Sequence, residues 1–178
     1  MAHEVVGDDE VVLTTSRPQL PTWWVGEALV IRQPWQERDP RVPPHRRLDA
    51  DGRPTVKDLE RWVQAQRPVT LGWLAVERKL EGGVVGHCGL LASERLPAGE
   101  PEVAFELLRH AWHQSFATEA ASAVLEWATR SGYQRVRATV REWNTASRRV
   151  LAPVGFMETD QIERDEVYGD TVFITRSL

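Results

Sequence analysis

Two pairs of polar residues stand at spacings that suit a reaction site. Glu102 and Glu106 lie four residues apart in an apolar stretch, so the alternation of a strand would turn both carboxylates to one face. Asn144 precedes Ser147 by three residues, about one helical turn, so both side chains can face one cleft. A carboxylate can accept a proton, and an amide or a hydroxyl can bind a polar ligand. The alternatives are a surface carboxylate pair and a helix N-cap at Asn144.

The segment 109–121 (RHAWHQSFATEAA) joins a predicted strand to a predicted helix. The strand is expected to end at Leu108 and the helix to begin near Ala117. Such a junction leaves backbone N–H groups unpaired at the positive end of a helix, which suits a phosphate or a pyrophosphate. The small residues Ser115 and Ala117 would let a ligand approach the backbone. The alternative is that these N–H groups bind only water or a cap.

The other residues able to do chemistry favour structural roles. His87 and Cys88 lie in a strand that reads as buried, and no acidic residue is placed to orient the histidine, so a core histidine and a buried thiol are expected. His110 and His113 precede the helix start and have no evident third ligand, so no metal site is expected. Cys88 is the only cysteine, which excludes an internal disulfide and a cysteine-rich zinc site.

Length and composition indicate an ordinary globular protein. The 178 residues favour one domain, 1–178, and the net charge of −4 argues against a nucleic-acid binder that relies on positive potential. No apolar run reaches the roughly 20 residues that cross a bilayer, so no membrane partner is expected. The start of the chain lacks the features of a signal peptide, and we expect a cytoplasmic protein. Most of the eight tryptophans are expected in the core or in cleft walls.

Apolar periodicity and turn residues predict a mixed α/β (α+β) sheet. The segment 38–54, with four prolines and many charges, is expected to be a solvated loop or a mobile flap over a substrate cleft. Gly82 and Gly83 predict a hairpin turn, and Tyr168 to Asp170 another. Strands are expected at 28–32, 70–78, 84–91, 102–108, 135–140, 156–162 and 167–175, and helices at 55–65, 118–130 and 145–154.

Several ordered motifs resemble the GNAT superfamily of acetyl-CoA-dependent N-acetyltransferases, and the branch that acetylates ribosomal-protein N-termini in particular. EVAFEL at 102–107 is similar to the family's E-I-G-Y-W-L strand, and WHQSFATEA at 112–120 to its W-G-K-G-Y-A-T-E-A loop and helix. The family's N-x-x-S-x-x-V-L-x-x-x-G-F motif is matched in order and spacing by residues 144–156. The match covers about residues 72–156. It implies a mostly antiparallel central sheet flanked by helices on both faces.

The resemblance implies a role for each matched residue. The pantetheine arm of acetyl-CoA would pair with the backbone, and the pyrophosphate would bind the N–H groups of the loop. Asn144 would hydrogen-bond the pantetheine, and Ser147 would face the sulfur and could stabilise or protonate the leaving thiolate. Some members use an acid at the position of Glu102 as the base, so the expected order is Glu102, then Glu106. The expected coenzyme-binding residues are Leu107, Leu108, Arg109, Gln114, Ser115, Phe116, Ala117, Thr118, Asn144 and Ser147.

The expected activity is transfer of an acetyl group from acetyl-CoA to a primary amine, by direct attack in a ternary complex. Residues 1–70 would form the acceptor side and 71–178 the coenzyme-binding core. The acceptor could be a protein N-terminus, a polyamine, an aminoglycoside-like molecule or an amino-acid-like metabolite, and a homodimer is possible. Two glycines of the family loop are His113 and Ser115 here, where side chains oppose positive φ. The alternative is therefore a CoA- or small-molecule-binding module that has lost transfer activity.

Overall fold

A nine-stranded sheet runs through the computed structural model, which describes the backbone of residues 3–7, 10–65 and 72–178. The strand order is β1-β2-β3-β4-β5-β6-β7-β9-β8, and every neighbouring pair is antiparallel except the parallel pair β6–β7. The predicted mixed and mostly antiparallel sheet is thus confirmed. The strands are β1 (His3–Gly7), β2 (Glu10–Thr14), β3 (Pro18–Leu20), β4 (Gly72–Arg78), β5 (Val84–Leu91), β6 (Glu102–Leu107), β7 (Arg135–Arg141), β8 (Met157–Glu163) and β9 (Thr171–Ser177).

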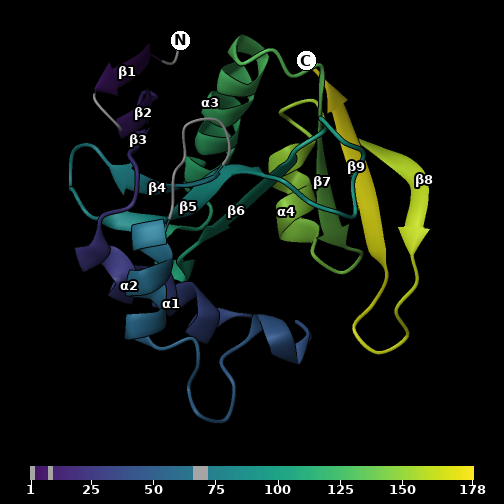
Figure 1. Cartoon of the computed structure of the whole chain (residues 1–178). Helices are drawn as coiled ribbons and strands as arrows, with labels where there is room; N and C mark the ends of the chain where they lie inside the picture. Colours follow the sequence, from purple (N-terminus) through teal and green to yellow (C-terminus); the bar gives the residue numbers. More distant parts are fainter. Residues whose placement is uncertain (1–2, 8–9, 66–71) are drawn as a thin grey trace.

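Helices cover both faces of the sheet, as Figure 1 shows for α1 and α2 on one side and α3 on the other. Alternation along β4 separates two apolar clusters, because Leu74 and Val76 join the cluster under α3 while Ala75 joins the cluster under α1 and α2. The α-helices are α1 (Ala28–Glu37), α2 (Val56–Ala65), α3 (Phe116–Arg130) and α4 (Thr145–Leu151), and the 3-10 turns are η1 (Val25–Glu27), η2 (Pro44–Arg46) and η3 (Arg109–Ala111). No helix of the described residues is long and apolar enough to span a bilayer.

The predicted strand at 28–32 is wrong, because these residues open helix α1. Ala28, Ile31 and Pro34 are its buried residues, so the apolar spacing is three residues and not the two of a strand. The Glu27 side chain accepts a hydrogen bond from the Trp24 N–H (2.9 Å) and caps the preceding turn. Pro34 inside the helix hid this pattern, since proline is disfavoured in a helix interior.

The other predicted elements lie within a few residues of their expected positions. Helix α2 starts after a reciprocal cap, in which Asp58 N–H donates to the Thr55 hydroxyl (3.2 Å) and the Thr55 N–H donates to the Asp58 carboxylate (2.8 Å). Residues 70 and 71, the start of the predicted strand 70–78, lie outside the described residues. The final hairpin of β8 and β9 forms as predicted, although residues 167–170 belong to its turn.

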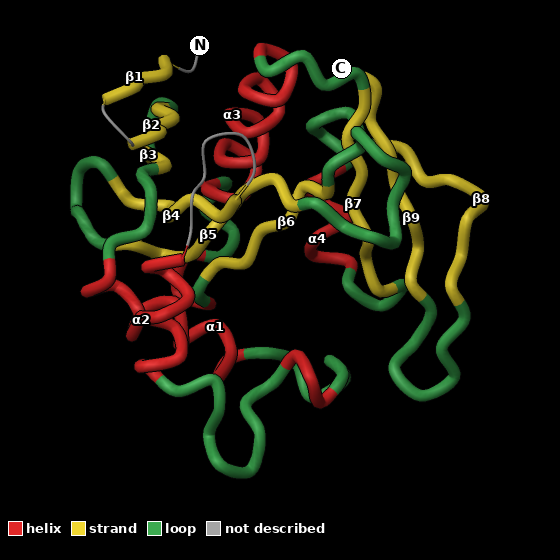
Figure 2. The backbone as a smooth tube through the Cα atoms, viewed as in Figure 1, coloured by secondary structure: helices red, strands yellow, loops and turns green. Residues whose placement is uncertain are grey.

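The two parallel strands separate after a short contact. Among the described residues the β6–β7 register holds a single pair, Glu102 with Arg137, although β6 continues to Leu107. Figure 2 shows the two strands diverging, with the loops that lead to α3 and α4 at the ends that have separated. The loop to α3 follows the end of β6, and the start of α4 follows the end of β7, so both helices begin next to the separated ends.

Candidate active site

The loop between β6 and α3, residues 109–118, has a row of backbone donors. Within the described residues, no hydrogen-bond acceptor is present for the N–H groups of residues 113–118, and no side chain caps α3. The first N–H groups of a helix point along its positive end, where they attract anions. The structure therefore brings together the predicted pyrophosphate-binding groups of Gln114, Ser115, Phe116, Ala117 and Thr118.

His113 and Ser115 hold left-handed backbone geometry in this loop. Their φ angles are 59° and 65°, and no other described non-glycine residue has a positive φ. For a residue with a side chain this conformation costs about 1–2 kcal/mol. The two positions are those at which the family has glycine, so the loop keeps its shape although the glycines are missing. Both residues are exposed, so their side chains have room outside the loop.

The end of β6 is already engaged in hydrogen bonds within the chain. The Leu107 carbonyl accepts from the Trp112 indole N–H (2.7 Å), and the Leu108 N–H donates to the Val85 carbonyl (2.8 Å). The Arg109 N–H donates to the Glu37 carboxylate of α1 (2.7 Å). The backbone predicted to pair with pantetheine is thus in place, and pairing there would displace Glu37 or Trp112.

Asn144 and Ser147 lie on the opposite side of the separated strands. The Asn144 side-chain oxygen accepts a hydrogen bond from the Ser147 N–H (3.1 Å), so Asn144 is the N-cap of α4. Its amide N–H₂ is still able to donate to a ligand. Both residues are half-buried, and the Ser147 hydroxyl has no hydrogen-bond partner among the described residues. The cap and the ligand role are therefore compatible.

Glu102 occupies the point at which β6 and β7 separate. One oxygen of its carboxylate accepts the Thr139 N–H (3.1 Å) and the Thr139 hydroxyl, so a side chain takes the place of a strand carbonyl. The second oxygen has no hydrogen-bond partner within the described residues. Glu102 is half-buried and lies on the same face of β6 as Glu106, as the sequence predicted.

Glu106 is bound on both oxygens by the guanidinium of Arg38, which follows α1. The His87 Nε2 atom lies 3.9 Å from the same carboxylate. Burial acts to raise the pKa of Glu106, but the hydrogen bonds and charge of Arg38 outweigh it, so the pKa lies below its usual value. Burial lowers the pKa of His87 to about 4, which leaves the imidazole neutral near pH 7.

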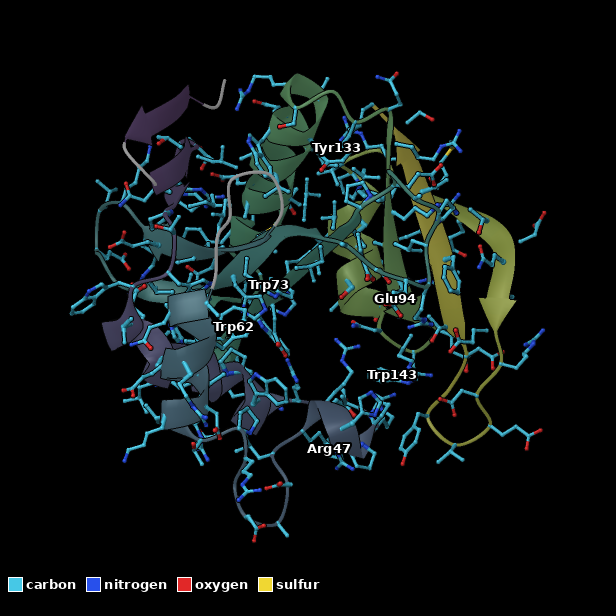
Figure 3. The ribbon with its side chains drawn as sticks, in the orientation of Figure 1. Arg47, Trp62, Trp73, Glu94, Tyr133 and Trp143 are labelled. Carbon is cyan, nitrogen blue, oxygen red and sulfur yellow. The ribbon has the colours of Figure 1, made fainter. Side chains whose placement is uncertain are left out.

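A cleft of about 1000 Å³ opens on this face, with His87 and Arg38 in its lining. Its aromatic walls come from three elements, with Trp35 on α1, Trp62 on α2 and Trp73 on β4, and Figure 3 shows Trp62 and Trp73 on the same side of the molecule. We call it the tryptophan cleft. Another hollow, of about 610 Å³, is lined by residues 98–100 and 131–135 and contains none of the predicted site residues.

The segment 38–54, expected as a solvated loop or a mobile flap, lies beside the candidate site, and its role as a flap stays a prediction. Its residues line the tryptophan cleft, and Arg38 binds Glu106 at one end. Further along, the Arg41 guanidinium stacks 4.2 Å from the ring of Trp143, the residue before Asn144. The segment therefore connects the α1 side of the site with the α4 side.

Sequence reasoning missed His87 and Arg38 as members of the site. His87 was expected in the core, and it is buried, with 8% of its surface exposed. Its ring nevertheless belongs to the cleft lining, where it lies edge-on to Trp73 (4.3 Å between centroids). The pairing of His87 with Glu106 on the neighbouring strands could have been found from the strand register. Cys88 faces the other cluster, and burial raises its pKa to about 12, so the thiol is inert.

No group of three metal-ligating side chains occurs in the described part of the chain. His110 and His113 were expected not to hold a metal. Both side chains are exposed, and His113 lies in the strained loop before α3.

Comparisons with known proteins agree with the fold. Residues 24–157 match the family model of the acetyltransferase (GNAT) domain, and none of the curated proteins compared with the chain matches it. A GNAT-family acetyltransferase from Bacillus anthracis has a similar fold (TM-score 0.74, 16% identity, covering 93% of this chain and 98% of that one). The ribosomal-protein-S5-alanine acetyltransferase of Vibrio fischeri also has a similar fold (TM-score 0.70, 15% identity, covering 94% of this chain and 96% of that one). So does Mycobacterium smegmatis RimJ, solved with CoA-disulfide (TM-score 0.69, 20% identity, covering 99% of this chain and 86% of that one). Because the family model covers most of the sequence, the chain belongs to the GNAT acetyltransferase family.

Proposed function

We propose that this protein transfers the acetyl group of acetyl-CoA to a primary amine by direct attack in a ternary complex. The observation that carries the proposal is the row of N–H groups at residues 113–118, which have no acceptor among the described residues and precede or open α3. Asn144 and Ser147, the other predicted coenzyme-binding side chains, lie at the start of α4. The left-handed geometry of His113 and Ser115 supports it, because strained backbone is kept where a ligand needs it. In this proposal the N–H groups bind the pyrophosphate, the end of β6 pairs with the pantetheine, and Asn144 donates to it.

The acceptor amine must lose a proton before it attacks the thioester carbonyl. Glu102 is the proposed base, directly or through one water, because one of its oxygens has no partner among the described residues. Glu106 ranks second, because Arg38 holds both of its oxygens and lowers its pKa. As the carbon–nitrogen bond forms, the carbon–sulfur bond breaks and the CoA thiolate leaves. The proposed role of Ser147 is to stabilise this thiolate with a hydrogen bond from its hydroxyl, while the proton that Glu102 took from the amine neutralises the thiolate.

Direct transfer also fits the state of the cysteine. A covalent acyl-enzyme needs an accessible thiolate, whereas Cys88 is fully buried with a pKa of about 12. The test is release of free CoA thiol from acetyl-CoA in the presence of a broad panel of amines. Release with at least one amine is expected, with CoA binding measurable by calorimetry. Tight CoA binding without release would instead identify a binding module, and no binding at all would refute both readings.

A further inference from the structure

The tryptophan cleft is lined by more positive than negative side chains, although the chain has a net charge of −4. Its two acidic side chains are engaged by the protein itself. Asp49 accepts hydrogen bonds from the N–H groups of Asp51 and Arg53, and Asp58 caps α2 and pairs with Arg61. The basic residues that line the cleft are Arg38, Arg47, Arg53, Lys57 and Arg61.

Arg47 stands out among these cations. Its Nε atom is buried without a hydrogen-bond partner, and no carboxylate of the described residues lies within ion-pair distance of its guanidinium. Arg38 is neutralised by Glu106 and Arg61 by Asp58, whereas Arg53 and Lys57, like Arg47, have no ion-pair partner among the described residues. The buried Nε atom is what sets Arg47 apart from these two. A buried donor without an acceptor is unfavourable, and a guanidinium binds a carboxylate through two parallel bonds. Arg47 is therefore in the state expected of a residue that receives an anionic ligand.

The rest of the lining is mostly apolar. Trp35, Trp62 and Trp73 present aromatic surface from three elements, of which Figure 3 labels Trp62 and Trp73. His87 adds a neutral ring, 4.3 Å from that of Trp73. A polycation would find only one carboxylate without an ion pair in this lining, Asp49, against five basic side chains. A ligand with one negative group and an apolar or aromatic side chain would satisfy both the cation and the walls.

We infer that the acceptor is an amino-acid-like molecule, a small amine that also carries a carboxylate and an apolar side chain, with Arg47 binding the carboxylate. This inference rests on the proposed function, since the cleft reaches Glu106 through Arg38 and His87 and so adjoins the end of β6. It separates the four acceptor classes that the sequence leaves open. Polyamines and aminoglycosides lack the anion, and a peptide N-terminus lacks a carboxylate next to its amine.

The test compares amino acids with their decarboxylated amines, such as phenylalanine with phenethylamine, tryptophan with tryptamine and leucine with isoamylamine. Spermidine, kanamycin and a tripeptide complete the panel. Binding is followed by quenching of tryptophan fluorescence without acetyl-CoA, and KM and kcat are then measured with acetyl-CoA. At least one amino acid is expected to bind about 10- to 100-fold more tightly than its amine, as one charge-assisted contact would give. Equal or tighter binding by the amine in every pair, or preference for spermidine, kanamycin or the tripeptide, would overturn the inference.

Substitution of Arg47 then assigns the contact. Arg47→Met is expected to raise the KM of the preferred amino acid at least 10-fold, to leave its kcat unchanged, and to move the KM of the matching amine less than twofold. Arg47→Lys keeps the positive charge but loses the paired N–H donors of the guanidinium, so it should restore part of the preference for the amino acid over its amine. Arg95→Met, which removes an exposed pair with Glu163 on β8, is the control and should change neither ligand. Equal effects of Arg47→Met on both ligands would contradict the assignment.

The binding measurement by fluorescence and the transfer measurement by thiol release test the inference and the proposed function separately. Carboxylate-selective fluorescence quenching without thiol release would refute the proposed transfer while leaving the cleft specificity intact. Thiol release with no preference for carboxylates would refute the specificity while leaving the transfer intact. If Arg47→Met does not fold, as judged from its thermal melt, Arg47→Lys and the ligand pairs on the unaltered protein still decide the question.

Discussion

The two sides of the candidate active site are built from different kinds of atoms. On the side of α3 the binding groups are backbone N–H groups of residues 113–118, set by strained φ angles and a helix start. On the side of α1 and α2 they are side chains of the tryptophan cleft, contributed by segments far apart in the sequence. Backbone groups are the same whatever the residue, whereas side chains differ at every position. The α3 side can therefore keep one ligand while the cleft changes its specificity.

The difference also sets what each side contributes to catalysis. The N–H groups of residues 113–118, the proposed coenzyme site, do not titrate in the range where proteins are stable. The cleft side contains ionisable groups with shifted pKa values, namely His87, whose pKa is lowered by burial, and Glu106, for which Arg38 outweighs the effect of burial and lowers the pKa. Substitutions on the α3 side should change coenzyme affinity, and substitutions on the cleft side should change turnover, acceptor binding and pH dependence. The four predictions below test that separation.

The largest effect is expected for Glu102→Gln. The change keeps the shape of the side chain and removes the proton acceptor, so turnover should fall about 10²- to 10⁴-fold with CoA affinity nearly unchanged. The loss should shrink as the pH rises, because more of the amine is then already deprotonated. Steady-state rates across pH 6–9 measure this. Glu106→Gln should have the smaller effect, and the reverse order would exchange the two roles. If neither matters, both carboxylates only attract the amine or support the sheet.

His87 should make the stability of the fold depend on pH. Its pKa is about 6.5 when unfolded and about 4 when folded, so its contribution is present in full above pH 6.5 and is lost as the pH falls towards 4. The difference between the unfolded and folded pKa values of His87 corresponds to about 3 kcal/mol in the free energy of unfolding. The free energy of unfolding, measured with denaturant at pH 7 and at pH 4.5, should fall less between these two pH values in His87→Gln than in the unaltered protein. His45→Gln, at an exposed site, is the control and should leave the loss unchanged. The same loss in His87→Gln would show that other groups cause it.

Ser115→Val should weaken coenzyme binding and leave the cleft unaltered. A β-branched residue is poorly tolerated at φ 65°, so the loop should abandon the geometry that aims its N–H groups. An affinity loss of about tenfold is expected from calorimetry with CoA, in line with strain of about 1–2 kcal/mol. Ser131→Val at the other end of α3, where φ is −79°, is the matched control. Unchanged CoA affinity in Ser115→Val would remove the loop from the binding site.

The smallest effect is expected where the two sides touch. Glu37 of α1 holds the Arg109 N–H, which the pantetheine is proposed to use. Glu37→Ala should free this group and raise CoA affinity by roughly three- to tenfold, as the loss of one competing hydrogen bond would allow. The KM for the acceptor amine should not change. Weaker CoA binding in Glu37→Ala would mean that Glu37 supports the bound coenzyme and does not compete with it.

Sequence patterns predicted the elements of the α3 side well because their information is local. A strand end, a short loop and a helix start lie within residues 102–130, and the proposed coenzyme site there consists of their backbone. Asn144 and Ser147 are likewise one turn apart on one helix. The main error, the strand expected at 28–32, arose because a five-residue apolar run fits either a strand or a helix, and Pro34 argued against the helix that forms.

The cleft side was predicted less completely because its contacts are long-range. Arg38 reaches Glu106 and Arg41 reaches Trp143 across large separations in the chain. A loop with four prolines gives no periodicity from which such contacts follow. His87 looked like a core residue since its burial is real, and only the pairing of β5 with β6 reveals its carboxylate neighbour.

The contact between Glu102 and Thr139 has a consequence for how the fold holds together. Strands β1–β6 and β7–β9 share one registered pair, so few main-chain hydrogen bonds transmit cooperativity across the sheet. The Thr139 amide is protected by a carboxylate and not by a carbonyl. Its hydrogen-exchange rate should therefore rise when Glu102 is protonated or replaced, ahead of amides elsewhere in β7. Local opening of this junction would separate strands β1–β6 from strands β7–β9. The two sets of strands would still be connected through α3, which packs on β5 and β6 and against α4.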